Sequence, residues 1–140
     1  VQERIEEVHN KTNFTLEGKK AIYNRLVESE LFEQYLNKKF LGTKRYGIEG
    51  GESMIPGIEQ IVKQACNAGV ENIFIGTAHR GRLTLLSTVL GMPYKSILSK
   101  CQGYVNDPNE VLGSWDLKYH LGCSKDREVD GKKNTYISCS

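Results

Sequence analysis

The fold class is indicated most clearly by the segment Val70-Glu71-Asn72-Ile73-Phe74-Ile75-Gly76-Thr77-Ala78-His79-Arg80-Gly81-Arg82. Its first half, residues 70–76, is rich in β-branched and aromatic side chains and predicts a buried strand. A helix follows the turn, because Leu83, Leu86 and Leu90 recur at helical spacing. A strand, a turn and a helix in this order are typical of an α/β layered fold, in which a parallel sheet is flanked by helices.

The segment upstream of this stretch begins with a long amphipathic helix. Thr15 can cap a helix over about 16–39. Glu33 and Lys38 are expected on its charged, solvated face. The apolar positions recur every three to five residues and form one stripe: Ile22, Leu26, Leu31, Tyr35 and Leu36, widened by Phe32 and Phe40.

A second helix is predicted between Ser53 and Gly69. Ser53 can cap it, and Pro56 falls in its first turn, where a missing N–H costs little. Gly69 is expected to end it. Its apolar face is expected to consist of Ile58, Ile61, Val62 and Ala65.

Shorter elements are expected after the helix that Gly91 and Pro93 end. In chain order they are a short helix near 94–101, a loop over 102–114, a charged turn over 125–133 and a strand over 135–140. The predicted organisation is a polar linker over 1–14, a lead-in helix over 15–41 and an α/β domain over 42–140. We expect that domain to be truncated, because the sequence stops inside the last predicted strand.

Composition narrows the class of protein. The chain has 140 residues with 19 basic and 17 acidic side chains, a net charge of +2 that indicates no nucleic-acid partner. Its apolar runs are far shorter than the roughly 18–20 residues of a membrane span, so none is expected. The four cysteines form no C-x-x-C pair, and we expect reduced thiols: Cys66, Cys101, Cys123 and Cys139.

The first candidate site is the turn His79-Arg80-Gly81-Arg82. It follows the carboxyl end of a predicted parallel strand, where ligands of open α/β sheets bind. Two arginines offer fixed positive charge and bidentate geometry to a phosphate or carboxylate. The sequence therefore predicts an oxyanion-binding turn with a histidine that can donate a proton. The alternative is a basic surface turn without function.

His120 is the second candidate. A lone histidine is more often structural than catalytic, yet His79 and His120 can converge from separate loops on one substrate carboxylate. We predict no metal site in this chain. The segment Asp126–Gly131 resembles a calcium loop but has Ile137 where a bidentate glutamate is required. His120 and the nearby cysteines lack a fourth zinc ligand at a plausible spacing.

Three ordered blocks resemble a known enzyme family, the thiamine-diphosphate-dependent first-enzyme components of 2-oxoglutarate dehydrogenase complexes. Lys44-Arg45-Tyr46-Gly47-Ile48-Glu49-Gly50-Gly51-Glu52 is similar to the family's K-R-F-x-L-E-G-x-E. Gly76-Thr77-Ala78-His79-Arg80-Gly81-Arg82-Leu83 is similar to G-M-x-H-R-G-R-L. Asp116-Leu117-Lys118-Tyr119-His120-Leu121-Gly122 is similar to D-V-K-Y-H-L-G. The resemblance implies part of a thiamine-diphosphate-binding fold with an N-terminal helical lead-in.

The resemblance also implies roles for individual residues. His79 and His120 are expected to bind the 2-oxo acid and handle protons at its carbonyl, and Tyr46 to line the substrate pocket. Arg80, with Arg82, is expected to meet the cofactor diphosphate. The complete enzyme is expected to be a homodimer that oxidatively decarboxylates 2-oxoglutarate in the tricarboxylic acid cycle. It passes the succinyl group to a lipoyl-bearing acyltransferase.

Other consequences of the resemblance concern the whole protein. The complete enzyme is expected in the mitochondrial matrix, or in the cytoplasm if the source is bacterial. Its magnesium motif is expected beyond Ser140. We therefore expect the 140-residue piece alone to be inactive.

Two rival interpretations stay open on the sequence. Lys44-Arg45-Tyr46-Gly47, followed by the segment 49–54, also resembles the sister branch that uses 2-oxoadipate, although that branch usually lacks the triplet kept here as Lys118-Tyr119-His120. The second rival is a truncated, non-catalytic relic whose arginine turn binds an anion without chemistry.

Overall fold

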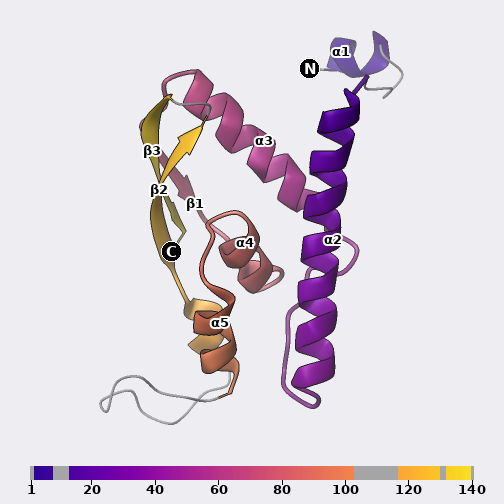
Figure 1. The fold of residues 1–140 in the computed structure, drawn as a ribbon, viewed down its shortest axis with the longest axis vertical. Coiled ribbons are helices and arrows are strands. Elements are labelled where there is room, and N and C mark those ends of the chain that lie inside the picture. Colours follow the sequence, from indigo (N-terminus) through magenta and orange to yellow (C-terminus); the bar gives the residue numbers. More distant parts are fainter. Residues whose placement is uncertain (1, 8–12, 103–116, 130–131, 140) are drawn as a thin grey trace.

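The structure is a computed structural model that describes residues 2–7, 13–102, 117–129 and 132–139 (Figure 1). The elements follow in chain order: α1 (Gln2–Glu7), α2 (Leu16–Lys39), α3 (Met54–Asn67), β1 (Asn72–Ile75), α4 (Arg82–Thr88), α5 (Tyr94–Cys101), a 3₁₀ turn η1 (Leu117–His120), β2 (Cys123–Val129) and β3 (Lys132–Cys139). The predicted α/β class is confirmed. The loop predicted over 102–114 falls almost wholly outside the described residues.

The lead-in helix α2 has the predicted bounds and the predicted cap. The Gly18 N–H donates a hydrogen bond to Thr15 Oγ1 at 3.1 Å. Lys38 and Lys39 lie in the last turn, where positive charge interacts favourably with the helix dipole.

The buried face of α2 differs from the predicted stripe. Phe32 and Leu36 are buried, but Leu31 is 59% and Tyr35 48% exposed. Glu33 was expected on the solvated face and is instead 5% exposed, because its carboxylate is bound by polar groups of the segments that pack on α2. The prediction for Glu33 is therefore wrong.

Removing the cap of α2 tests its stability. We expect Thr15→Ala to lower the free energy of unfolding by about 1 kcal/mol, because the Gly18 N–H loses its acceptor. Urea denaturation followed by circular dichroism measures the change. Thr15→Ser, which keeps an acceptor oxygen, is the matched control and should stay near the parent. Equal losses in both variants would contradict the capping role.

The sheet has the strand order β1-β3-β2 and is mixed. β1 pairs with β3 in parallel, with Asn72 opposite Tyr136, whereas β2 and β3 are antiparallel, with Cys123 opposite Cys139. The charged turn predicted over 125–133 is wrong, since most of these residues belong to β2 and β3. β2 lies at an edge of this sheet, where charged side chains are common and hinder pairing with other chains.

The strand of the segment 70–82 is parallel as predicted but covered on one face only. Ile73 and Ile75 pack against the core, while Phe74 is 76% exposed. The prediction of a fully buried strand is therefore wrong. Figure 1 shows the reason, because α3, α4 and α2 all lie on the same side of the sheet.

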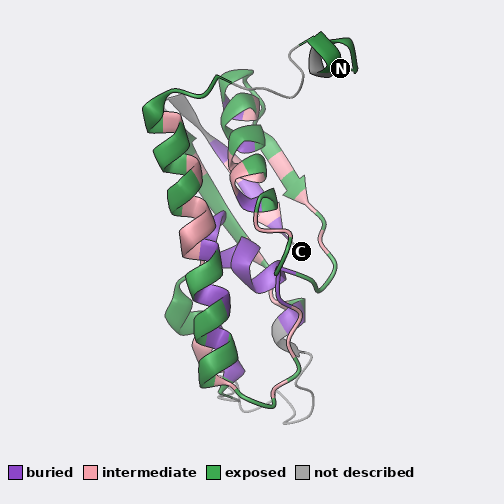
Figure 2. Cartoon of the chain, turned by 90° about the vertical axis from the view of Figure 1, so that its right-hand side faces the viewer, coloured by how far each residue is buried: buried purple, intermediate pink, exposed green. Residues whose placement is uncertain are grey.

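The core is centred on α4, and Figure 2 shows its ribbon wholly in the colour of buried residues. Leu85 and Leu86 are both 0% exposed. One cluster lies between the sheet and α3 with α4, and includes Ile55, Val62, Leu85, Leu86 and Ile137. A second joins α2, α4, α5 and η1, and includes Phe32, Leu36, Leu83, Ile97 and Tyr119.

The helix α3 follows some of the predicted signals. Pro56 lies in its first turn and Gly69 follows it with a φ of 83°. Ser53 makes no side-chain capping bond, because its own backbone is helical. Ile61 is 65% exposed, since the inward face is set by Ile55, Val62 and Cys66.

The cysteines are free thiols, as predicted: Cys66, Cys101, Cys123 and Cys139. Burial raises the pKa of the Cys123 thiol. The thiols belong to, or pack against, the two apolar clusters and therefore behave as small apolar side chains.

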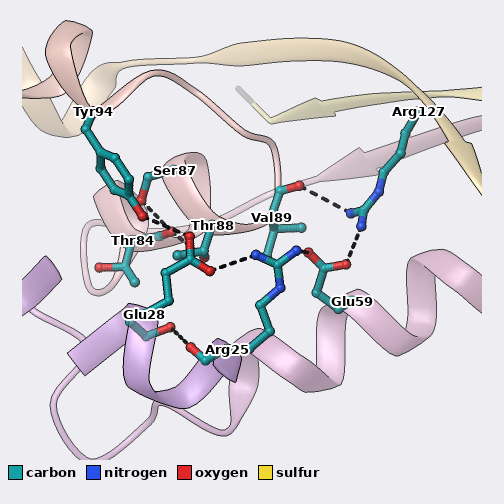
Figure 3. Close-up of polar contacts among 10 residues, drawn as sticks. Arg25, Glu28, Glu59, Thr84, Ser87, Thr88, Val89, Tyr94 and Arg127 are labelled. Carbon is teal, nitrogen blue, oxygen red and sulfur yellow. Dashed lines mark hydrogen bonds and ion pairs between the residues drawn. The ribbon is translucent and has the colours of Figure 1, made fainter. Parts of the chain in front are cut away.

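An ion-pair network ties α2 to α3 and β2 (Figure 3). Arg25 contacts Glu28 at 2.8 Å and Glu59 at 3.2 Å. Arg127 also pairs with Glu59, and the Tyr94 hydroxyl donates to Glu28 at 2.9 Å. Most charges of this network are paired within it, so the network fixes the positions of α3 and β2 relative to α2.

Candidate active site

The site begins where the chain leaves the carboxyl end of β1. Residues 76–80 form the turn into α4, and Gly81 occupies the left-handed region with a φ of 70°. His79 and Arg80 are both exposed on this turn. This is the edge of the sheet at which the sequence predicted a ligand crevice.

The loop 44–50 packs directly against this turn. The Gly81 N–H donates a hydrogen bond to the Tyr46 carbonyl at 2.9 Å. A Cβ at position 81 would lie 2.9 Å from Ile48 Cγ1, so only glycine allows this approach. The backbone contact places Tyr46 beside His79, with ring centroids 5.4 Å apart and planes 24° apart.

The turn η1 is the third segment that contributes side chains to the site. Its His120 ring lies 5.5 Å from the His79 ring, centroid to centroid, at 82°. Its Tyr119 ring lies 5.0 Å from the Tyr46 ring, and the Tyr46 N–H donates to Tyr119 Oη at 2.7 Å. The structure therefore brings together Tyr46, His79 and His120, three of the five residues predicted for the site.

The accessibility of these rings suits ligand binding. His79 and His120 are exposed and Tyr46 is half-buried, whereas Tyr119 is 2% exposed. Two exposed imidazoles whose ring centroids lie 5.5 Å apart can donate hydrogen bonds and carry protons. The Nζ of Lys44 lies 5.1 Å from the Tyr46 ring centre and adds positive charge nearby.

The two arginines of the turn have different environments. Arg80 is exposed, and its Nη2 donates to the Glu49 carbonyl at 2.7 Å. Arg82 is 4% exposed. Its Nε donates to the Leu121 carbonyl at 2.9 Å and its Nη1 to the Thr77 carbonyl at 2.8 Å. Arg82 is thus held by the protein and links the β1 turn to the segment after η1, whereas Arg80 is exposed and is bonded through its Nη2.

Sequence reasoning missed two residues behind the site. Tyr119 directly precedes His120 in the sequence, and this adjacency to a predicted site residue could have pointed to it. Glu33 gave no signal, because a single glutamate on a long helix is usually solvated. Its Oε1 accepts hydrogen bonds from the Ile48 N–H at 3.1 Å and from the Thr84 hydroxyl, and its Oε2 pairs with Arg45.

The electrostatics of this layer are perturbed. Burial, reinforced by the charge of Glu33, raises the pKa of Tyr119 to about 12. Burial by itself would lower the pKa of Arg45. The hydrogen bonds and negative charges of Glu49 and Glu33 have the larger effect and raise this pKa. Burial by itself would raise the pKa of Glu49. The hydrogen bond from its own backbone N–H and the positive charges of Arg45 and Arg80 have the larger effect and lower this pKa.

Among the residues that the structure describes, no three or more His, Cys, Asp or Glu side chains gather as a metal-binding group. Within the same residues, no helix combines the length and apolar character needed to cross a membrane.

Comparison with known proteins agrees with the motifs. No protein-family profile matches the chain. The chain is 53% identical over 133 residues, 95% of its length, to the 2-oxoglutarate dehydrogenase E1 component of Brucella anthropi. The Brucella canis and Brucella suis E1 components are 52% identical over the same length. This chain is similar to one segment of the 2-oxoglutarate dehydrogenase E1 component. The predicted family resemblance is confirmed, and the chain spans 13% of the length of these E1 relatives.

Proposed function

We propose that this chain supplies one wall of the active site of a 2-oxoglutarate dehydrogenase E1 component, an enzyme that decarboxylates a 2-oxo acid. The observation that carries the proposal is the convergence of Tyr46, His79 and His120 from three separate segments. These segments are the three sequence blocks that resemble the family. Such a convergence is not needed for folding, because both histidines are exposed.

The chemistry of the site fits a small 2-oxo acid. Such a substrate has carboxylate and carbonyl oxygens that accept hydrogen bonds, and His79 and His120 are two exposed donors whose ring centroids lie 5.5 Å apart. We assign His79 and His120 to binding the substrate oxygens and holding protons there. Tyr46 lines the pocket and fixes the His79 ring by stacking on it.

The residues present fit part of a thiamine diphosphate site. Arg80 is exposed and offers a guanidinium to a diphosphate oxygen, whereas Arg82 is already bound to two backbone carbonyls. We therefore assign the diphosphate contact to Arg80 alone. Thiamine diphosphate, when bound, supplies the nucleophilic carbon and the electron sink of the decarboxylation. We place the magnesium ligands on residues outside this chain.

The same assignment extends to the whole protein. The E1 component is a homodimer and passes a succinyl group to a lipoyl-bearing acyltransferase. It works in the cytoplasm of a bacterium or the mitochondrial matrix of a eukaryote. The 140-residue chain alone neither binds the cofactor usefully nor catalyses. Calorimetry that detects magnesium-dependent binding of thiamine diphosphate to this chain would contradict the last point.

A chimera tests the function directly. The matched segment of the Brucella anthropi E1 component is replaced by this chain, and decarboxylation is followed with an artificial electron acceptor. We expect a folded dimer that turns over 2-oxoglutarate in preference to 2-oxoadipate. Preference for 2-oxoadipate would move the assignment to the sister branch. A folded dimer without turnover of either acid would favour a non-catalytic anion-binding relic.

A further inference from the structure

Glu33 is a buried carboxylate in the middle of α2, and the catalytic chemistry does not use it. It is 5% exposed. Burying a carboxylate is costly unless its oxygens are paired. Both oxygens of Glu33 are bound, and their partners come from the loop 44–50 and from α4.

These partners lie on either side of one site residue. Arg45 precedes Tyr46 and pairs with Glu33 Oε2. Ile48 follows Tyr46 and donates its N–H to Glu33 Oε1 at 3.1 Å. The short loop that carries Tyr46 is therefore bound to Glu33 at two points, one before and one after the residue whose ring stacks on His79.

The fixed loop then positions the rest of the site. The Tyr46 carbonyl accepts the Gly81 N–H and the Tyr46 N–H donates to Tyr119 Oη, at 2.9 and 2.7 Å. The Tyr46 ring stacks on the His79 ring. Thr84, in the first helical turn after Gly81, donates its hydroxyl to the same Glu33 oxygen that accepts the Ile48 N–H. One carboxylate thus links the two segments that contribute Tyr46 and His79.

We propose that Glu33 is a positioning residue that sets the stacking of Tyr46 on His79 and so orients the His79 imidazole toward the substrate. The part that concerns substrate rests on the proposed function. The part that concerns ring geometry rests only on the contacts of Glu33. The two parts can therefore be tested separately.

The substitution Glu33→Gln keeps the size of the side chain and one acceptor oxygen. It removes the charge, and in either orientation the amide NH2 opposes a group that can only donate, the Arg45 guanidinium or the Ile48 N–H. We expect the loop to shift at Arg45 and the Tyr46 ring to leave His79. The matched control is Glu30→Gln on the same helix, because Glu30 is exposed and accepts only a local bond from Gln34 within the described contacts.

Proton NMR of the 140-residue chain gives a readout that a purely structural role would not move. We expect Glu33→Gln to shift the His79 ring protons and to remove their nuclear Overhauser contacts with the Tyr46 ring. Methyl signals of Leu85 and Leu86, in the core, should stay dispersed. If Glu33→Gln does not fold, the pair Glu33→Gln/Arg45→Gln leaves no buried charge without its partner and is measured in the same way. Unchanged His79 signals in the folded variant would overturn the proposal.

The chimeric enzyme supplies the second arm. There we expect Glu33→Gln to lower kcat/KM for 2-oxoglutarate by about 10- to 100-fold, because small displacements in a site cost that much. Glu30→Gln should leave it unchanged. If His79→Ala abolishes turnover but Glu33→Gln has no effect, the positioning role is wrong and the proposed function stands. If Glu33→Gln moves the His79 signals but His79→Ala leaves turnover normal, the proposed function fails and the positioning role of Glu33 stands.

Discussion

Alanine at His79 or at His120 is expected to lower kcat/KM of the chimeric E1 enzyme for 2-oxoglutarate by about 100-fold or more. This is the usual size of a positioned acid–base contribution. The centroids of the two rings lie 5.5 Å apart, so each variant leaves one donor close to the position of the other. The fold-loss of kcat/KM in the double variant should therefore be smaller than the product of the two single fold-losses, since both residues act on one substrate.

The control variant removes an aromatic ring from a surface position outside the candidate active site. Tyr23 is 66% exposed on α2, and Tyr23→Ala should leave kcat/KM within a factor of about two, as surface substitutions usually do. Thermal unfolding of every variant separates loss of function from loss of fold. Near-normal turnover in His79→Ala or His120→Ala, with the fold intact, would remove that histidine from the mechanism.

The second large effect is expected at Gly81. The left-handed backbone there disfavours any side chain by about 1–2 kcal/mol. A Cβ would also lie 2.9 Å from Ile48 Cγ1 and 3.0 Å from Ile48 Cβ, and forcing such contacts costs about 1–3 kcal/mol. We expect Gly81→Ala to lower the free energy of unfolding by about 2–5 kcal/mol, measured by urea denaturation.

Gly50 offers a matched control for that experiment. It also has a positive φ, 83°, but a Cβ there meets nothing within 4 Å. Gly50→Ala should therefore cost only the backbone contribution of about 1–2 kcal/mol. Equal losses at Gly50 and Gly81 would show that the close approach of Ile48 contributes nothing.

Local signals in the sequence predicted the local structure well. Thr15 and the helical spacing behind it predicted α2, and the segment after Pro93 predicted α5, because capping groups and chain breakers act within one turn. The convergence of His79 and His120 was foreseen as a hypothesis, because the carboxyl end of a parallel strand gathers ligands.

Failures occurred where tertiary contacts outweigh local pattern. Charged residues of 125–129 belong to a strand, because pairing with β3 satisfies their backbone. Glu33 is buried because its partners come from loop 44–50 and from α4. The hydrogen bonds of Arg82 to the carbonyls of Thr77 and Leu121 depend on how η1 packs, which no spacing in the sequence reveals, and the predicted contact of Arg82 with the cofactor diphosphate stays a prediction. Each of these depends on a contact between distant parts of the chain.

The parallel pairing of β1 with β3 has a consequence for folding order. Asn72 finds Tyr136 only after the intervening chain has closed a long loop, whose entropic cost rises with loop length. Contacts among α2, α3 and α4 span shorter separations and are expected to form earlier. His120 lies closer to His79 along the chain than Asn72 does to Tyr136, and η1 packs on α4 and α5, so the pairing of the two imidazoles does not require the sheet to close. The chain is therefore expected to complete its sheet after its helices have packed, and stopped-flow signals that report the pairing of β1 with β3 should lag behind helix formation.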